Sequence, residues 1–287
     1  MAEKSLEAHF IKCLKEGNTK KALYIVELLG DKVNTLYRGK SPLLWAKEFE
    51  NKEVARVLKE KGAVEKAISK EEAEKLGIEL VEEARKRNLE AVIELIEKGA
   101  KVNQENDYGE TALIKASQNG HLEIVEKLID AGANLNVKDE NKKTALMWAL
   151  DNEYIDIALK LIEKGADVNQ KDDVNNISLI TASFNGYLEI VERLIEKGAK
   201  VNQKNEWGNT ALIWASRKGY VEIVKALLDA GADVNIKSNT GSTAMSLAKN
   251  EETRRAILDA VKKRKEKAKE NEPGFMEKMK GLFGKGE

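Results

Sequence analysis

Apolar residues recur at helical spacing in three segments of the chain, with charged residues between them. In the first segment Leu122, Val125 and Ile129 form one stripe, which Ile124 and Leu128 widen. An apolar stripe this broad predicts an amphipathic helix that is covered both by a partner helix and by a neighbouring repeat. The same pattern returns at residues 188–195 and 221–228.

These helical segments belong to a repeat with a period of 33 residues. A Gly-Ala-x-(Val/Leu)-Asn motif marks each copy, and a second block of the type Thr-Ala-Leu-Ile keeps step with it. Self-similarity at a fixed period of this length is typical of stacked helical repeats. The glycine motif starts at Gly99, Gly132, Gly165, Gly198 and Gly231, and the second block starts at Thr111, Thr144, Ile177, Thr210 and Thr243.

Together these blocks resemble the ankyrin repeat, in which a hairpin tip is followed by a short helix and a longer antiparallel helix. The resemblance implies an all-α repeat solenoid, an ankyrin-type helix-turn-helix stack with short β-hairpin tips. The chain departs from the family's Thr-Pro-Leu-His motif, because most copies lack the proline and the histidine is replaced by an apolar residue. We therefore expect apolar packing instead of the family's threonine–histidine hydrogen bond, and less rigid helix starts. The replacing residues are Ile114, Met147, Ile180 and Ile213.

Glycine and threonine positions predict the turns of each repeat. Gly132 and its equivalents follow the last turn of the long helix, where a left-handed residue often ends a helix. The hydroxyl of Thr111 and its equivalents is placed to cap the short helix. At the hairpin tips we expect a left-handed backbone conformation, which is less favourable for Lys142 than for glycine or asparagine. The tip positions are Gly109, Lys142, Asn175, Gly208 and Gly241.

The N-terminal third of the chain departs from the regular period. Residues 6–14 and 19–29 predict a capping helix pair, and residues 30–46 read as a repeat with a shortened tip. The interval from Gly62 to Gly99 is 37 residues, longer than the period, and it contains the capping box Ser69-Lys-Glu-Glu. The capping box predicts a helix that continues to about Arg87. We interpret residues 64–77 as an insertion that lengthens one repeat's first helix, with a joint between two ankyrin stacks as the alternative.

These patterns divide the chain into four parts. An N-terminal helical cap plus a first ankyrin repeat is predicted for residues 1–63, and an irregular repeat with a lengthened first helix for 64–98. Regular 33-residue repeats follow over 99–262, and a charged C-terminal tail over 263–287. In the tail, Pro273-Gly274 is expected to end a solvated helix, and Phe275–Phe283 predicts a short amphipathic segment. That segment either folds back on the last repeat or docks on a partner.

Charge and cysteine content narrow the possible functions. Lysine plus arginine and aspartate plus glutamate number 49 each, so no net field attracts nucleic acid. No apolar run is long enough for a membrane span or a signal peptide. The single cysteine, Cys13, excludes an internal disulfide and is typical of a reducing compartment. We predict a cytoplasmic monomer that binds no nucleic acid and has no membrane span.

No motif in the sequence predicts catalysis. His9 and Cys13 lie four residues apart, so they could share a helix face and form a thiolate–imidazole pair, the smallest unit of cysteine-based catalysis. No third group that would orient the imidazole accompanies them. We expect Cys13 to pack in the core. His121 occupies the family's Gly-His position, which implies a local structural hydrogen bond. The sequence contains no Cys/His metal spacing, P-loop or dinucleotide fingerprint, so we predict a non-enzyme without cofactor or metal.

The resemblance also implies where a partner protein binds. In the family, hairpin tips and the inner faces of the first helices form a concave surface that captures other proteins. All four tryptophans of this chain map to those positions, and large aromatic side chains are good interface anchors. The alternative is a structural spacer whose C-terminal amphipathic tail carries the main docking motif. The predicted partner-binding residues are Trp45, Tyr108, Lys115, Trp148, Phe184, Trp207, Trp214 and Arg217.

Overall fold

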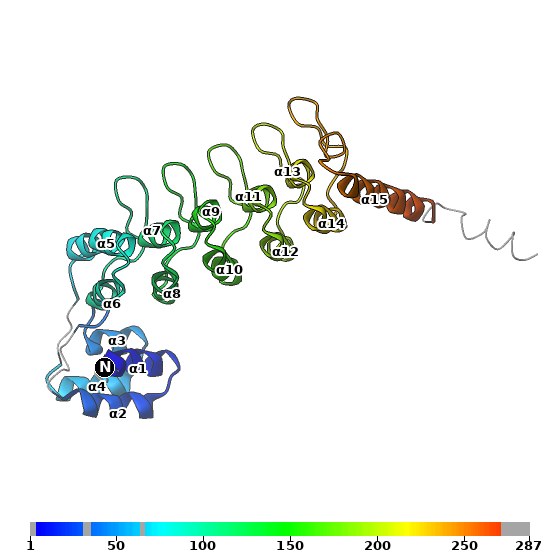
Figure 1. Ribbon diagram of the computed structural model, residues 1–287. Helices are drawn as coiled ribbons and strands as arrows, with labels where there is room; N and C mark the ends of the chain where they lie inside the picture. The colour runs from blue at the N-terminus through cyan, green and yellow to red at the C-terminus, as the bar shows by residue number, and fades with distance from the viewer. Residues whose placement is uncertain (1–3, 31–35, 64–66, 271–287) are drawn as a thin grey trace, which may run out of the picture. The chain divides into compact units, whose positions relative to one another are not determined.

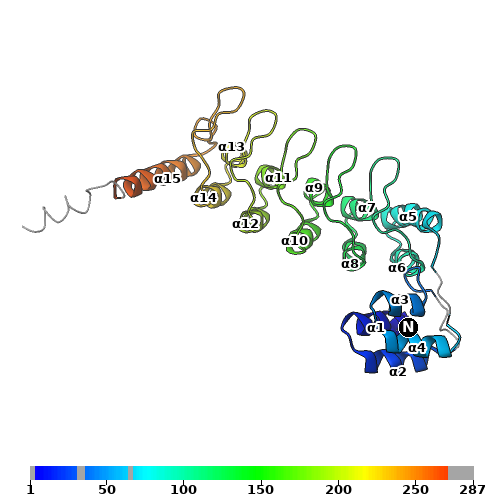
Figure 2. The same cartoon turned by 180° about the vertical axis from the view of Figure 1, so that it is seen from behind.

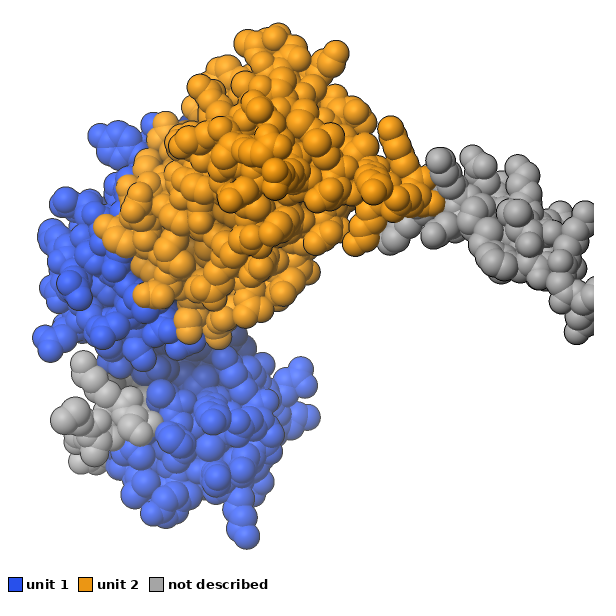
Figure 3. Space-filling view, turned by 45° about the vertical axis from the view of Figure 1, so that its right-hand side comes forward, with its two compact units in different colours: residues 1–140 blue, residues 141–287 orange. Residues whose placement is uncertain are grey.

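The computed structural model describes residues 4–30, 36–63 and 67–270. These residues form fifteen α-helices and no named strand, with only the isolated bridges Tyr37–Lys40 and Lys40–Ala67. The chain divides into two compact units, residues 1–140 and 141–287, which Figure 3 shows in different colours. Within each unit, helix pairs stack as in an all-α repeat solenoid.

The first unit contains four helix pairs (Figure 1). Helices α1 to α4 share a hydrophobic core that includes Phe10, Val26, Leu43 and Leu58. Helix α5 packs on α6 and α7, and α7 packs on α8. The helices are α1 (Lys4–Lys15), α2 (Thr19–Leu29), α3 (Pro42–Glu48), α4 (Lys52–Glu60), α5 (Lys70–Arg85), α6 (Leu89–Lys98), α7 (Ala112–Gln118) and α8 (Leu122–Asp130).

The second unit contains three regular helix pairs and a long last helix (Figure 2). The short helices α9, α11 and α13 neighbour one another, and so do the longer helices α10, α12 and α14, while α15 packs on α14. The tips that precede α11 and α13 project to the same side. The helices are α9 (Ala145–Asp151), α10 (Ile155–Glu163), α11 (Ser178–Asn185), α12 (Leu188–Glu196), α13 (Ala211–Lys218), α14 (Val221–Asp229) and α15 (Glu251–Glu270).

The buried stripe of the long helices is shifted from its expected centre. Ile124, Val125 and Leu128 are almost fully buried in α8, whereas Leu122 and Ile129 are half-buried. Leu122 instead lines a shallow cleft together with Leu89 of the preceding repeat. Leu122 therefore lies beside the preceding repeat, while the centre of the stripe is buried.

The short helices begin as predicted. The hydroxyls of Thr111, Thr144 and Thr210 accept hydrogen bonds from the N–H groups three residues later at 3.3, 3.4 and 3.3 Å. The residues that replace the motif histidine are buried, which confirms the expected apolar packing: Ile114, Met147, Ile180 and Ile213. Ile177 starts α11 without any side-chain cap.

The structure contradicts the prediction of a last short helix after Thr243. Residues 244–247 form a turn, although Thr243-Ala244-Met245-Ser246 matches the block that starts the short helices elsewhere. The Ser246 hydroxyl accepts a hydrogen bond from the Thr243 N–H at 2.9 Å and donates one to the Thr243 carbonyl at 3.0 Å. A serine that occupies nearby backbone groups in this way competes with helix formation.

The tips have the expected left-handed residues but are simple turns. Gly109, Gly208 and Gly241 have φ between +69° and +77°, and Lys142 and Asn175 have φ of +56° and +60°. The expected short β-hairpins are not confirmed, since no strand is named among the described residues. One backbone hydrogen bond joins neighbouring tips, such as the N–H of Asn239 donating to the Trp207 carbonyl at 3.0 Å.

The irregular segment contains a lengthened helix. The Ser69 hydroxyl accepts a hydrogen bond from the Glu72 N–H at 3.1 Å and caps α5, which is 16 residues long and ends at Arg85. The backbone of the first four helices touches the rest of the unit at two glycines, Gly39 and Gly99. The contact is so close that a Cβ added to Gly99 would lie 2.4 Å from the Gly39 Cα. The Gly39 carbonyl also accepts from the Ile68 N–H at 2.9 Å. The division of the chain into four parts stays a prediction.

Helix α15 packs further along the chain than the sequence indicated. Thr253 and Ile257 are buried against α14. The Arg264 guanidinium donates to the carbonyls of Leu228 and Ala232 at 2.8 and 2.9 Å, so it caps the end of α14. The predicted break at Pro273-Gly274 and the segment Phe275–Phe283 lie outside the described residues. Within the described part of the chain, no helix is long and apolar enough to cross a membrane.

Candidate protein-binding site

A cleft of ≈ 460 Å³ lies across the short helices of the second unit. Its walls come from α11, from the start of α13, from the end of α9 and from the tip that carries Trp207. A cleft of this volume is large enough to accept several side chains of a peptide segment. The lining residues are Asp151, Asn176, Ile180, Thr181, Phe184, Asn185, Asn205, Trp207 and Trp214.

Three aromatic side chains dominate the cleft. Phe184 and Trp214 meet edge to face, with ring centroids 4.9 Å apart. Phe184 is 38% exposed and Trp207 48% exposed, whereas Trp214 is half-buried. Aromatic rings that remain this accessible bury much apolar area on binding and lose few rotamers, so they are favourable anchors for a partner.

Two cations lie over these rings. The Arg217 guanidinium is 5.3 Å from the centre of the Trp214 ring, and the Lys218 ammonium is 4.1 Å from that of Phe184. Such contacts hold a cation beside an aromatic face by a modest electrostatic attraction. Neither cation has an ion-pair partner among the described residues, so both charges remain available to an acidic group of a ligand.

The tip that carries Trp207 is held by the side chain of Asn205, which is 5% exposed. Its Oδ1 accepts hydrogen bonds from the N–H groups of Trp207 and Asn209 at 3.1 and 3.0 Å. Its Nδ2 donates to the Asn176 Oδ1 of the preceding tip at 3.1 Å. The backbone beneath Trp207 is therefore fixed before any partner binds, which lowers the entropic cost of binding.

The sequence matches the family model for ankyrin repeats (3 copies) over residues 80–172 and 179–267. The chain belongs to the ankyrin repeat family. Ankyrin repeats are typically non-catalytic modules that bind other proteins. No curated protein matches the chain in sequence.

Many solved structures are similar to this ankyrin-repeat chain, and two of them show the extent of the similarity. One is a chain from the structure of a complex between the predatory endopeptidase Bd0816 from Bdellovibrio bacteriovorus and the immunity protein Bd3460. It is 31% identical with a TM-score of 0.56, over 63% of this chain and 96% of that one. The other is an ankyrin repeat domain from Acinetobacter baumannii AYE, 28% identical with a TM-score of 0.60, over 64% of this chain and 97% of that one.

The structure brings some of the predicted binding residues together and separates others. Phe184, Trp207 and Trp214 line the cleft, and Arg217 lies over the Trp214 ring. Trp148 lies in the same unit but does not line it. Its half-buried ring is 4.4 Å from the Lys143 ammonium, which pairs with Asp151 at 2.8 Å.

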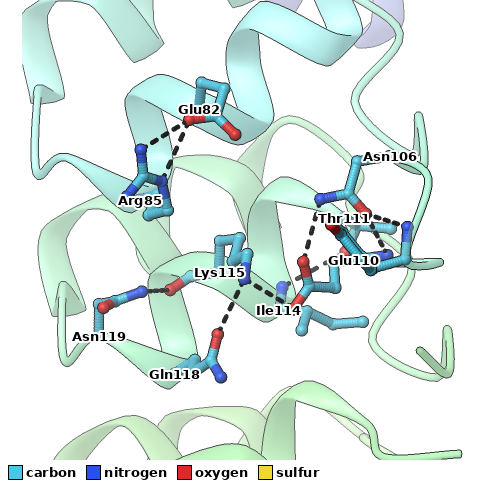
Figure 4. A network of polar contacts seen from close by, with 10 residues as sticks. Glu82, Arg85, Asn106, Glu110, Thr111, Ile114, Lys115, Gln118 and Asn119 are labelled. Atoms are coloured by element: carbon cyan, nitrogen blue, oxygen red, sulfur yellow. Dashed lines mark hydrogen bonds and ion pairs between the residues drawn. The ribbon is translucent and has the colours of Figure 1, made fainter. Parts of the chain in front are cut away.

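Tyr108 and Lys115 belong to the first ankyrin unit. Tyr108 is 64% exposed at its tip, where its N–H donates to the Asn106 Oδ1 at 3.0 Å. The Lys115 ammonium donates to Glu110 at 2.6 Å and to Gln118 at 3.2 Å (Figure 4). Because this ion pair is largely buried, Lys115 offers little free charge to a ligand.

Trp45 is a structural residue of α3. Its indole N–H donates to the Tyr37 carbonyl at 2.9 Å, and its ring stacks on Phe49 with centroids 5.8 Å apart. Both rings pack against the core of the first four helices. Because its indole N–H and one ring contact are used within the first four helices, and the Lys40 ammonium lies 4.7 Å from its ring centre, Trp45 is a weaker candidate for partner binding than Trp207.

The two histidines and the cysteine have structural surroundings. Cys13 is buried in the core of α1 to α4, as expected, while His9 is exposed. The His121 Nε2 lies 3.1 Å from the Arg85 carbonyl, a local hydrogen bond between neighbouring repeats that agrees with the prediction for this position. In the described part of the chain no group of His, Cys, Asp and Glu could hold a metal ion.

Sequence reasoning did not single out several residues of the cleft. Asn205 and Asn176 hold the tip, Thr181 and Asn185 line the wall, and Lys218 covers Phe184. Lys218 carried one usable signal, since it follows Arg217 at the end of α13 without an acidic residue within three positions before or after it.

Proposed function

We propose that this ankyrin-repeat protein is non-catalytic and binds a segment of a partner protein in the cleft across α9, α11 and α13. The observation that carries the proposal is the accessible aromatic group of Phe184, Trp207 and Trp214 around a cleft of ≈ 460 Å³. An apolar side chain of the partner fills the space between the rings. Arg217 and Lys218 favour a partner residue of negative charge beside it.

Among binding roles, a sequestering inhibitor or an immunity-type neutraliser of a partner enzyme is favoured over a general adaptor. The support is the similarity to a chain of the structure of an endopeptidase in complex with an immunity protein, at 31% identity. The single cysteine, Cys13, is buried and free, which favours a reducing compartment such as the cytoplasm. We propose that the protein works there as a monomer.

The test is a pair of measurements on Trp207→Ala/Trp214→Ala. The wild-type chain captures its partner from native lysate, and calorimetry then compares the affinities of the two proteins for that partner. We expect the double variant to lose at least ~2 kcal/mol of binding free energy, the usual scale for interface hot spots. The matched control is Tyr154→Ala, which removes an exposed aromatic ring outside the cleft of the same unit.

Thermal melting of the same variants separates binding from folding. An unchanged affinity with a normal melt would move the site elsewhere, and a chain shortened after residue 270 then tests the alternative spacer with a docking tail. A collapsed melt of the double variant would mean that the tryptophans are structural residues.

A further inference from the structure

A second cleft, of ≈ 640 Å³, lies in the first unit along α3 and α4. Its lining is basic, with Glu50 as the one acidic side chain among the lining residues. Small or polar residues, Ala46, Asn51 and Ala55, form the rest. The basic lining residues are Lys47, Lys52, Arg56 and Lys59.

Three of the four basic residues, Lys47, Lys52 and Lys59, occupy positions that are small or apolar in the regular repeats. Ser41 caps α3 as Thr111 caps α7, and Gly62 follows α4 as Gly132 follows α8, so the two pairs can be aligned position by position. Lys47 then takes the place of the fully buried Ser117, Ser183 and Ser216. Lys52 takes the place of Leu89 and Leu122, and Lys59 that of Ile96 and Ile129.

In the other repeats these positions lie at the boundary with a neighbouring repeat. The Ser216 carbonyl accepts a hydrogen bond from the Lys249 N–H at 3.1 Å, and Lys249 lies in the next repeat. Leu89 lines one cleft with His121 and Leu122, again in the next repeat. The basic cleft is therefore the face of α3–α4 on which another repeat would stack. Among the described residues, however, α3 and α4 do not pack on α5 and α6 as α5 packs on α7.

We propose that this α3–α4 face binds an acidic helix of another protein. Lys52, Arg56 and Lys59 follow one another at positions i, i+4 and i+7 on one side of α4, a span of about 10 Å along the axis. Carboxylates at the same spacing on a helix lying alongside would meet all three cations. Lys52 and Lys59 make no ion pair with described residues, whereas Arg56 pairs with Glu60 of its own helix at 2.6 Å.

The surroundings favour a helix over a nucleic acid. In the regular repeats, the corresponding face of α10 receives α12 and that of α12 receives α14, so this position in the repeat is one that accepts a helix. None of the residues that line the cleft is aromatic, so no ring is present on which a base could stack. This site is independent of the aromatic cleft of the second unit.

The experiment uses the full chain and a fluorescent helical peptide with glutamates at i, i+4 and i+7, with binding followed by anisotropy. Lys52→Glu/Lys59→Glu should weaken peptide binding at least about tenfold, since two charge pairs are reversed. The matched control, Lys20→Glu/Lys21→Glu on the exposed side of α2, should bind like wild type. A peptide with lysines in place of the glutamates should bind the Lys52→Glu/Lys59→Glu variant and not the wild type.

Several results would overturn the proposal. The first is that the acidic peptide does not bind, and the second is that a peptide with glutamines in place of the glutamates binds equally well. The third is that a duplex oligonucleotide binds as tightly as the acidic peptide and depends in the same way on Lys52 and Lys59. Self-association of the chain that disappears in the double variant would assign the face to a second copy instead. Circular dichroism confirms that the variants fold. Trp207→Ala/Trp214→Ala should bind the acidic peptide like wild type, so failure here and failure of the proposed function are distinguishable.

Discussion

Glycines at the same repeat position have different structural roles. Gly99 and Gly132 each follow a long helix, with φ of +97° and +90°. A Cβ on Gly132 would meet no atom within 4 Å, whereas one on Gly99 would meet the Gly39 backbone at 2.4 Å. Both glycines permit the left-handed turn, but only Gly99 also permits two backbone segments to touch.

We therefore expect Gly99→Ala to lower the free energy of unfolding more than Gly132→Ala. The Gly132 variant carries the cost of a left-handed alanine, about 1–2 kcal/mol. The Gly99 variant adds a steric clash, for which overpacked sites typically lose a further ~1–3 kcal/mol. Urea denaturation of both variants measures the difference. Equal losses would mean that the Gly39 segment moves away at no cost.

A second residue prediction concerns Asp172 at the tip before α11. Burial raises the pKa of its carboxyl group, and the hydrogen bonds from the N–H groups of Asn176 and Val174 lower it without cancelling that effect. Asn106 and Asn205 make the same pair of backbone contacts from the equivalent positions without a charge.

Because the pKa of Asp172 is higher in the folded chain, its protonated form favours folding, and that advantage is lost as pH rises through the folded pKa. We expect Asp172→Asn to raise stability at pH 7, by less than about 1 kcal/mol since partial exposure screens the charge. The gain should vanish as pH falls below the ordinary aspartate value of 3.8. Thermal melts of wild type and Asp172→Asn across this pH range check the prediction. A variant that is less stable than wild type at pH 7 would contradict it.

At the scale of helices, sequence period and caps account for α7 to α14, because each copy repeats the same local chemistry. They could not foresee that residues 244–247 form a turn. There Ser246 stands where Ile114 and Ile213 are buried, and it binds the backbone of Thr243 instead. The sequence match at the helix start was therefore not sufficient for a helix once Ser246 replaced the buried apolar side chain.

The cleft was predicted only in part, for a related reason. Comparing copies pointed to Trp207 and Trp214, but Trp45 and Trp148 share the sequence position of Trp214. Their surroundings differ because Trp45 finds the Tyr37 carbonyl and Trp148 finds Lys143. Which of these tryptophans lines the cleft depends on neighbouring repeats, and a single copy of the motif does not contain that information.

Helix α5 allows a prediction at this scale. Ser69→Ala removes the hydroxyl that caps its first turn, and lost N-caps cost about 1 kcal/mol. We expect faster hydrogen exchange at residues 70–76, while the end of α5, which packs on α7, stays protected. Thr19→Ala, at the start of α2, is the control and should leave α5 unchanged. If residues 70–76 already exchange like a free linker in wild type, the joint between two stacks becomes the better interpretation.

At the scale of the whole molecule, repeat proteins are stabilised by contacts within and between neighbouring repeats, so a local defect need not spread. The first four helices have a hydrophobic core of their own, in which Leu58 is fully buried. Leu227 is fully buried in α14 of the second unit. Substituting either leucine with alanine removes comparable volume from two separate places.

We expect Leu58→Ala to lower hydrogen-exchange protection in α1 to α4 and to leave α13 and α14 unchanged, with Leu227→Ala giving the reverse. Each substitution should cost about 2–5 kcal/mol locally, as buried leucine-to-alanine changes do. Hydrogen exchange resolved by mass spectrometry reports both regions in one experiment. If either variant lowered protection evenly across all described helices, the chain would unfold as one cooperative unit. The separate core of α1 to α4 would then have no independent stability, and the basic α3–α4 face would not persist once the second unit unfolds.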